Sequence, residues 1–282
     1  MDNSKLERLA AFTEQPGGGN PAGVWTGSSL PEDAEMQRIA KAVGYSETAF
    51  LTPTGADTWT IRYFSPEAEV PFCGHATIAS GVALGNRHGE GLYRLQTSVG
   101  EVPVQVRRND EGQTVATLTS VEPQSKPIDP ALLTEVLGLL GWLESDLDPN
   151  IPAAIAFAGA WHLVIAVAER AVLARLDYDF PRLKALMLEH DLTTLQLVWQ
   201  QDRTTFHSRN PFPVGGVVED PATGAAAAAF GGYLRELGRV TPPADVRIRQ
   251  GEDMGRPSTL FVHIPTSGGI AVTGAAIAMA SD

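Results

Sequence analysis

The sequence predicts an α+β fold of two similar halves, in each of which strands surround one buried helix. The first observation is a run of small and apolar residues at 76–84, which has no polar face and therefore predicts a helix buried on all sides. The second is a similar run at 225–234, preceded like the first by glycine and polar residues. The third is the series of short strand-like segments around both runs. Together they indicate a weak internal duplication.

In the first half, strands are predicted where short apolar or alternating segments lie between turn residues. The segment at 14–23 is rich in glycine and proline and is predicted to be a loop. The segment at 31–44 begins with proline and acids, has apolar residues on one face and ends in glycine, which predicts an amphipathic surface helix. Strands are expected at 6–12, 45–51, 58–64, 92–106 (with a turn at 98–100) and 113–118.

A proline-rich segment at 123–130 marks the predicted boundary between the halves. The halves are then residues 1–124 and 125–282, and the last strand is a candidate to cross back to the first half. The second half has the same style of patterning, with a buried helix after Asp220. Further helices are expected at 131–139 and 181–189, and strands at 155, 161–167, 195–199 and in closing segments from 247, 260 and 270.

The composition excludes several classes of protein. Of 282 residues, 43% are hydrophobic and 19% charged, a soluble globular balance, and the net charge of −12 argues against a nucleic-acid-binding surface. The single cysteine excludes an intrachain disulfide, and the first residues do not resemble a signal peptide, so the expected location is the cytoplasm. The apolar run at 151–168 contains proline, glycine and histidine, and is predicted to be a strand pair rather than a membrane span.

Two features suggest a functional site. A buried helix that starts near Gly74 has unpaired backbone N–H groups in its first turn, and the positive end of its dipole favours an anion. Glu47 is the one charged residue in a segment otherwise fit for burial, and such a group is seldom buried without a partner or a purpose. The other histidines show no metal-ligand spacing, so no metal site is predicted.

Four motifs now carry a resemblance to a known family. They are the segments at 19–24 (GNPAGV), 46–50 (SETAF), 72–77 (FCGHAT) and 219–224 (EDPATG). In this order and spacing they resemble the PhzF-like phenazine-biosynthesis isomerases, which are relatives of diaminopimelate epimerase. The resemblance covers nearly the whole chain. It implies the diaminopimelate epimerase-like fold, with an active site in a cleft between the halves, a homodimer, and no metal, nucleotide or pyridoxal phosphate.

The resemblance also implies an activity and roles for residues. The phenazine enzyme moves a proton on trans-2,3-dihydro-3-hydroxyanthranilate by general acid/base catalysis. The family glutamate that takes the proton corresponds to Glu47, and its partners correspond to His75 and Asp220. A small carboxylate substrate is expected at the two helix starts, and the candidate substrate-binding residues are Ser46, Cys73, Gly74, Gly224 and Ala225.

Each catalytic assignment has a simpler alternative. Glu47 could be an ion-pair partner on an exposed strand face. His75 could be a residue of the first helical turn that is hydrogen-bonded to a carbonyl. Asp220 precedes a proline and could serve as an ordinary helix cap. That role is compatible with catalysis, since a carboxylate at a helix N-terminus stays ionised and can orient a partner.

Two departures from the family pattern leave the reaction open. The epimerase relatives have a cysteine at each helix start. Here the first helix start has Cys73, but the second has Asp220 in place of a cysteine, so racemisation by two thiols is not supported. Ala225 stands where the family commonly has serine, which removes one hydroxyl donor and puts the phenazine substrate in question. The alternatives to the isomerase are an epimerase or racemase that uses Cys73 against Glu47 or Asp220, and a non-catalytic, dimeric module that binds small anions.

Overall fold

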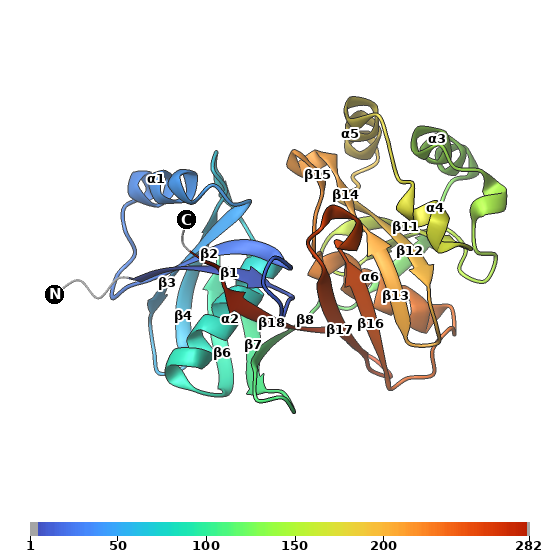
Figure 1. Cartoon of the computed structure of the whole chain (residues 1–282). Coiled ribbons are helices and arrows are strands. Elements are labelled where there is room, and N and C mark those ends of the chain that lie inside the picture. The colour runs from blue at the N-terminus through green and yellow to red at the C-terminus, as the bar shows by residue number, and fades with distance from the viewer. Residues whose placement is uncertain (1–4, 281–282) are drawn as a thin grey trace. The chain divides into compact units, whose positions relative to one another are not determined.

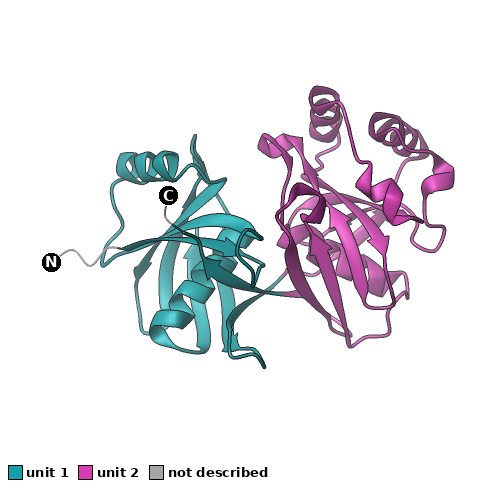
Figure 2. Cartoon of the chain, in the orientation of Figure 1, with its two compact units in different colours: residues 1–119, 273–282 teal, residues 120–272 magenta. Residues whose placement is uncertain are grey.

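The computed structural model describes residues 5–280, and the chain divides into two compact units. Unit 1 holds residues 1–119 and 273–282, and unit 2 holds residues 120–272 (Figure 2). Both units combine helices with β-sheet, so the predicted α+β class is confirmed (Figure 1). No helix among residues 5–280 is long and apolar enough to span a membrane.

The sheet of unit 1 closes into a barrel. Its strands follow one another in the order β1, β2, β3, β4, β6, β7, β8 and β18, and β1 also pairs with β18, which joins the two ends. The short strand β5 (Glu69–Val70) pairs with β4. The strands are β1 (Lys5–Ala11), β2 (Asn20–Thr26), β3 (Glu47–Pro53), β4 (Thr58–Phe64), β6 (Gly91–Thr97), β7 (Gly100–Arg108), β8 (Thr114–Thr119) and β18 (Ala271–Ala278).

Two helices serve as crossovers between the parallel strands of this barrel. Parallel neighbours cannot be joined by a tight hairpin, and a helix is the usual connection. The helix α1 (Asp33–Val43) connects the parallel pair β2 and β3, and α2 (Gly74–His88) lies between β4 and β6, which are also parallel. The amphipathic helix predicted at 31–44 is confirmed as α1, which buries Met36, Ala40 and Val43.

The helix α2 is buried as the sequence predicts. Every residue from His75 to Gly85 is buried, and the helix contacts β1, β2, β3, β7 and β8. Glycines let β7 approach closely, since a Cβ atom at Gly81 would lie 2.8 Å from Val104 Cγ1 and one at Gly85 would lie 2.4 Å from Val106 Cγ1. The run of small residues at 76–84 therefore allows the close packing of helix against strand.

Unit 2 contains an open sheet with helices packed against it. The strand order is β17, β16, β13, β12, β11, β10, β9, and α6 (Gly224–Glu236) contacts β9, β10, β11, β12 and β17. Buried apolar side chains pack the helices α3, α4 and α5 against β11 and β12. The bounds are β9 (Gln124–Pro127), α3 (Pro130–Leu140), β10 (Ala154–Phe157), β11 (Trp161–Val167), α4 (Arg170–Ala174), α5 (Phe180–Glu189), β12 (Thr194–Gln200), β13 (Thr205–Arg209), β16 (Ala244–Gln250) and β17 (Ser258–Ile264). A separate small hairpin pairs β14 (Pro211–Phe212) with β15 (Val217–Glu219), and short 3-10 turns lie at Glu144–Asp146, Pro213–Gly215 and Glu252–Met254.

Some predicted elements differ from the structure. The segment at 14–23 is not all loop, because residues 20–23 pair with β1 and begin β2. The proline-rich segment at 123–130 contains β9 and is not a bare linker. The strand β13 was not predicted as such. The apolar run at 151–168 holds the antiparallel pair β10 and β11, so the strand-pair interpretation is confirmed.

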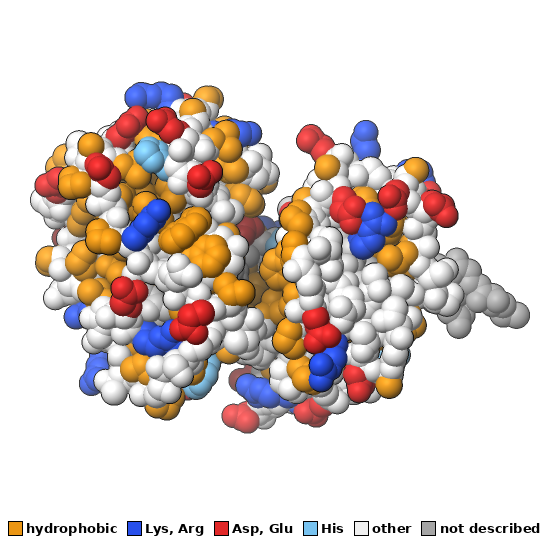
Figure 3. All heavy atoms as spheres, turned by 180° about the vertical axis from the view of Figure 1, so that it is seen from behind, with side chains coloured by type: hydrophobic (Ala, Val, Ile, Leu, Met, Phe, Trp, Pro, Cys, Tyr) orange, Lys and Arg blue, Asp and Glu red, His pale blue; other side chains and the backbone are white. Residues whose placement is uncertain are grey.

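Charged side chains of both signs are scattered over the face seen in Figure 3. On the face seen in Figure 3, lysine and arginine side chains lie singly or in small groups among aspartate and glutamate side chains. Several form exposed ion pairs, such as Arg62 with Asp33 and Glu69. With a net charge of −12, this face has no continuous basic area.

Candidate active site

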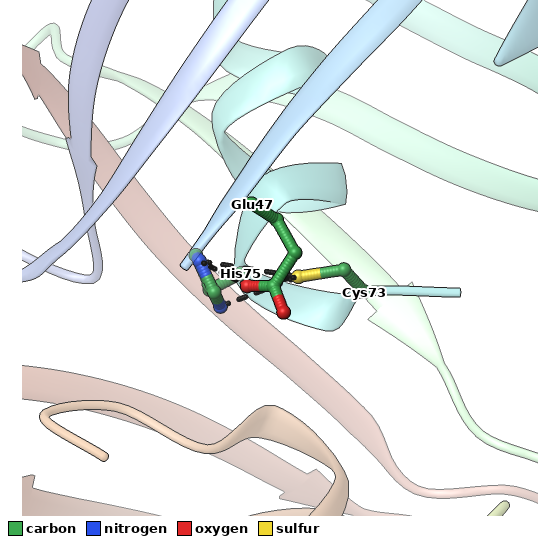
Figure 4. Close-up of side chains that lie close together, drawn as sticks. All are labelled: Glu47, Cys73 and His75. Carbon is green, nitrogen blue, oxygen red and sulfur yellow. Dashed lines mark hydrogen bonds and ion pairs between the residues drawn. The ribbon is translucent and has the colours of Figure 1, made fainter. Parts of the chain in front are cut away.

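Three side chains of unit 1 converge at the start of α2. Figure 4 shows Glu47, Cys73 and His75 pointing toward one another. The Cys73 thiol donates to Glu47 Oε2 at 3.4 Å, and Glu47 Oε2 lies 3.5 Å from His75 Nε2. The Cys73 sulfur also lies 3.4 Å from His75 Nδ1. Three of the residues singled out in the sequence are therefore one cluster in the structure.

Local structure explains why these groups meet. Glu47 is the first residue of β3, and Cys73 is the extended residue just before α2, with φ −146° and ψ 115°. His75 is the second residue of the helix, so its ring lies beside the sulfur two residues earlier. The parallel pairing of β2 and β3 places Glu47 opposite Ala22, in the strand that α2 also contacts. The barrel thus brings together residues that are 26 and 28 positions apart.

The cluster is mostly buried but reaches the surface at Glu47. Cys73 is 8% exposed and His75 is 7% exposed, whereas the Glu47 side chain keeps 19% of its area exposed. Glu47 therefore does not lie on an exposed strand face, although it does have an ion-pair partner, His75. The ring nitrogens of His75 lie near a thiol, a carboxylate and the Ser46 hydroxyl, whose Oγ is 3.4 Å from Nε2.

A buried pair of hydroxyl groups holds the backbone of Cys73. The Thr77 hydroxyl donates to the carbonyl of Cys73 at 2.6 Å, and the Tyr63 hydroxyl lies 2.6 Å from Thr77 Oγ1. Because Thr77 has one hydroxyl proton and uses it for the carbonyl, Tyr63 is the donor of the second bond. Burial raises the pKa of the Tyr63 hydroxyl above its usual range, which keeps it protonated as this role requires. The sequence motifs did not indicate Tyr63.

The backbone at Gly74 is open. The Cys73 side chain, at the N-cap, makes no cap hydrogen bond to the first turn of α2. A Cβ atom built at Gly74 would meet no atom within 4 Å. A small anion therefore has space to approach the positive end of this helix.

The second predicted group of residues lies in unit 2, at the start of α6. Gly224 and Ala225 are the first two residues of that helix, and Asp220 precedes it by one turn. The N-cap of α6 is Thr223, so the interpretation of Asp220 as the helix cap is wrong. Instead, Asp220 Oδ2 accepts a hydrogen bond of 2.6 Å from the Thr223 hydroxyl.

Gln250 is a supporting residue that the sequence did not indicate. Its Nε2 donates to the Asp220 carbonyl at 2.7 Å and to Thr223 Oγ1 at 2.9 Å, and its Oε1 accepts from the Thr223 N–H at 3.3 Å. Gln250 is 1% exposed and ends β16. No local pattern marks it, because its partners lie 27 to 42 residues away in the chain.

The chain is similar to known proteins along nearly its whole length. The family described as phenazine biosynthesis-like protein (PhzC-PhzF) matches residues 9–282. A protein of Bacillus subtilis named uncharacterized isomerase YfhB is 30% identical over 290 residues, covering 98% of this chain and 97% of that protein. The trans-2,3-dihydro-3-hydroxyanthranilate isomerase of Pseudomonas chlororaphis is 31% identical over 256 residues, covering 90% of this chain and 88% of that protein.

A solved structure has the same fold over nearly the whole length. The phenazine biosynthesis protein of the PhzF family from Bacillus anthracis superposes with a TM-score of 0.87 at 25% sequence identity, covering 99% of this chain and 98% of that one. These matches confirm the family that the four motifs indicate. The chain belongs to the PhzC-PhzF family of phenazine biosynthesis-like proteins.

Proposed function

We propose that this protein is a cofactor-independent isomerase that moves a proton by general acid/base catalysis on a small carboxylate metabolite. Relatives named isomerases along nearly the whole chain support the reaction class. We extend the proposal to a homodimer that acts in the cytoplasm, with two epimerase-like halves at 1–124 and 125–282, each with a central helix enclosed by strands. A single cysteine is compatible with a reducing compartment.

The observation that carries the proposal is the position of the Glu47 carboxylate. It lies 3.4 Å from the Cys73 sulfur and 3.5 Å from His75 Nε2, and part of its surface is open to solvent. A general base needs an accessible lone pair on one side and groups that hold its orientation on the other. Glu47 would accept a proton from a substrate carbon, leaving the electron pair delocalised in the substrate. After that proton exchanges with solvent, a proton from Glu47 or His75 would be delivered to another carbon of the same skeleton.

Substrate binding is proposed at the backbone of the helix starts. The free space beside Gly74 and the positive end of α2 suit a substrate carboxylate. By family resemblance, Ser46 and Cys73 line the same site, Asp220 assists the proton transfer, and Gly224 and Ala225 bind substrate. Because Ala225 offers no hydroxyl, we propose that the preferred carboxylate differs from the phenazine precursor.

Solvent-deuterium exchange tests this function. The protein is incubated in deuterium oxide with trans-2,3-dihydro-3-hydroxyanthranilate and with a panel of small cyclic and acyclic amino and hydroxy acids. We expect deuterium at carbon for one class of compound with the wild type, and a loss of at least about 100-fold with Glu47→Gln, since general acid/base catalysis contributes about 10²–10⁴-fold. Unchanged turnover by Glu47→Gln would overturn the assignment. Tight carboxylate binding without any exchange would instead support a binding module.

An epimerase or racemase that uses Cys73 is the second candidate, and the position of the thiol at the start of α2 favours it, since a helix N-terminus stabilises a thiolate. The structure restricts this candidate. Two bases that invert a carbon act on its opposite faces, but Cys73 and Glu47 are 3.4 Å apart and lie on the same side. The other candidate for the second base is Asp220. Inversion of configuration that Cys73→Ala abolishes and Glu47→Gln leaves intact would favour this reaction.

A further inference from the structure

We propose that Glu47, Cys73 and His75 also form a three-ligand site for Zn²⁺. Among residues 5–280, this is the one group of three histidine, cysteine or carboxylate side chains whose ligand atoms all lie within 4.8 Å of one another. The three residues come from two elements, β3 and the start of α2, which the barrel packs together. The cluster is drawn in Figure 4.

The distances between the ligand atoms suit tetrahedral zinc. Bonds of about 2.3 Å to sulfur and about 2.0–2.2 Å to nitrogen and oxygen place sulfur about 3.6 Å from each lighter ligand, and nitrogen about 3.4 Å from oxygen. The Cys73 sulfur lies 3.4 Å from Glu47 Oε2 and 3.9 Å from His75 Nε2, and those two atoms are 3.5 Å apart. Each separation differs from the ideal edge by a few tenths of an ångström. The sulfur lies closer to His75 Nδ1, at 3.4 Å, than to Nε2, so zinc binding requires the imidazole ring to turn until Nε2 faces the sulfur and the carboxylate.

The chemistry of the ligands favours zinc over the harder divalent cations. A thiolate and an imidazole select zinc or copper, whereas magnesium and calcium prefer sites made only of oxygen. A thiolate and a carboxylate together also neutralise the double charge of the ion. Binding replaces the S–H bond with a Zn–S bond and releases the thiol proton to solvent, so the affinity rises with pH.

The site is reachable and leaves a position for a fourth ligand. The exposed part of Glu47 gives an ion access from solvent, while Cys73 and His75 are held inside the fold. Gly74, between these two ligands, has no side chain to crowd the ion, and a Cβ atom there would meet no atom within 4 Å. Three protein ligands and one open position are the pattern of accessible zinc sites rather than of closed structural ones.

Bound zinc would inhibit the enzyme. This consequence rests on the proposed function, because the ion would occupy the carboxylate lone pair that the proton transfer uses. Zinc binding itself does not depend on that function and is measured separately. The site would thus make activity sensitive to free zinc and restorable by a chelator.

Metal titration of the full chain tests the site. Zn²⁺ is titrated by calorimetry in buffers of different protonation enthalpy, and Co²⁺ is titrated by absorption, where a thiolate ligand produces a charge-transfer band. We expect micromolar or tighter zinc binding with release of a proton. Cys73→Ser should lose the charge-transfer band and at least about 100-fold in zinc affinity, because even a partner outside the ligand shell is worth about 10–100-fold. Glu47→Gln should weaken binding and keep the band.

The matched control is His207→Gln. His207 is another mostly buried histidine beside a carboxylate, with Nδ1 2.6 Å from Glu252 Oε2, but it has no thiol nearby among the residues described. The His207→Gln variant should bind zinc with the same affinity as the wild type. The proposal is overturned if the wild type binds no zinc in this range, or if Cys73→Ser keeps the wild-type affinity. If zinc binds as expected but no substrate exchanges deuterium, the metal site stands and the proposed function fails.

Discussion

Arg209 forms a buried ion pair with Glu219, the residue directly before Asp220 in the chain. Arg209 Nε donates to Glu219 Oε2 at 2.9 Å, and its Nη2 donates to the other carboxylate oxygen. The arginine Nη1 donates to the Ala174 carbonyl at 2.9 Å, so the guanidinium also binds the end of α4. The side chains are 10% and 7% exposed. The pair therefore ties β13 and α4 to the segment that leads into α6.

This pair is predicted to show strong coupling. Arg209→Met leaves the Glu219 carboxylate buried without its cation and should lower the free energy of unfolding by about 3–5 kcal/mol. The double variant Arg209→Met with Glu219→Met should lower the free energy of unfolding by less than Arg209→Met alone, because no uncompensated charge remains. Urea denaturation of both single variants and the double variant measures the coupling. Costs that simply add would contradict the prediction.

Two glycine-to-alanine variants should change the free energy of unfolding in opposite directions. At Gly85 in α2, a Cβ atom would lie 2.4 Å from Val106 Cγ1, so Gly85→Ala should destabilise the protein by about 1–3 kcal/mol. At exposed Gly138 in α3, no atom lies within 4 Å of the new Cβ. Gly138→Ala should stabilise by about 0.5–1 kcal/mol, the gain in helix propensity. Thermal and urea unfolding compare them, and a stabilising Gly85→Ala would show that β7 does not pack closely on α2.

His162 should make stability depend on pH in the acid range. Burial lowers the pKa of His162 to about 3, and Nδ1 lies 2.7 Å from the Thr194 hydroxyl. Between that value and about 6.5, the unfolded chain binds one proton more than the folded protein, so stability falls as pH decreases. The contribution is about 1.4 kcal/mol per pH unit.

The variant His162→Asn isolates this effect, because it keeps a polar atom near Thr194 but does not titrate. Urea unfolding of both proteins between pH 4 and pH 8 is the measurement. Above about pH 7 the difference in free energy of unfolding between the wild type and His162→Asn should be constant. Below about pH 6 this difference should shrink as the wild type loses stability. A difference that stays constant down to pH 4 would show that His162 is protonated in the folded state.

The hydroxyl chain from Tyr63 to Cys73 should have graded effects. Tyr63→Phe removes one donor but leaves the Thr77 bond to the Cys73 carbonyl, and should cost about 1 kcal/mol. Thr77→Val removes both bonds and leaves the Tyr63 hydroxyl buried without a partner, and should cost about 2–3 kcal/mol. Thr77→Ser keeps the hydroxyl and is the control. Equal costs for Tyr63→Phe and Thr77→Val, measured by urea unfolding, would contradict this chain.

The buried helix was predictable because its cause is local. Residues 76–84 have no polar face, and such a helix is stable only when it is covered, as α2 is. The helix predicted at 31–44 likewise has its start, apolar face and end in one short segment. The loop predicted at 14–23 was wrong over residues 20–23, because their strand conformation comes from pairing with β1 and β3, which glycine and proline do not reveal.

The sequence by itself determined the class of the fold and the family, and it predicted Glu47, His75 and Asp220 as candidate site residues, since the motifs around them are short and contiguous. Only the tertiary structure decided what these residues contact. The barrel brings Glu47 against Cys73, and β16 places Gln250 beside Asp220. Such contacts join residues tens of positions apart. They depend on strand pairing and helix packing over the whole unit, and no local sequence pattern encodes them.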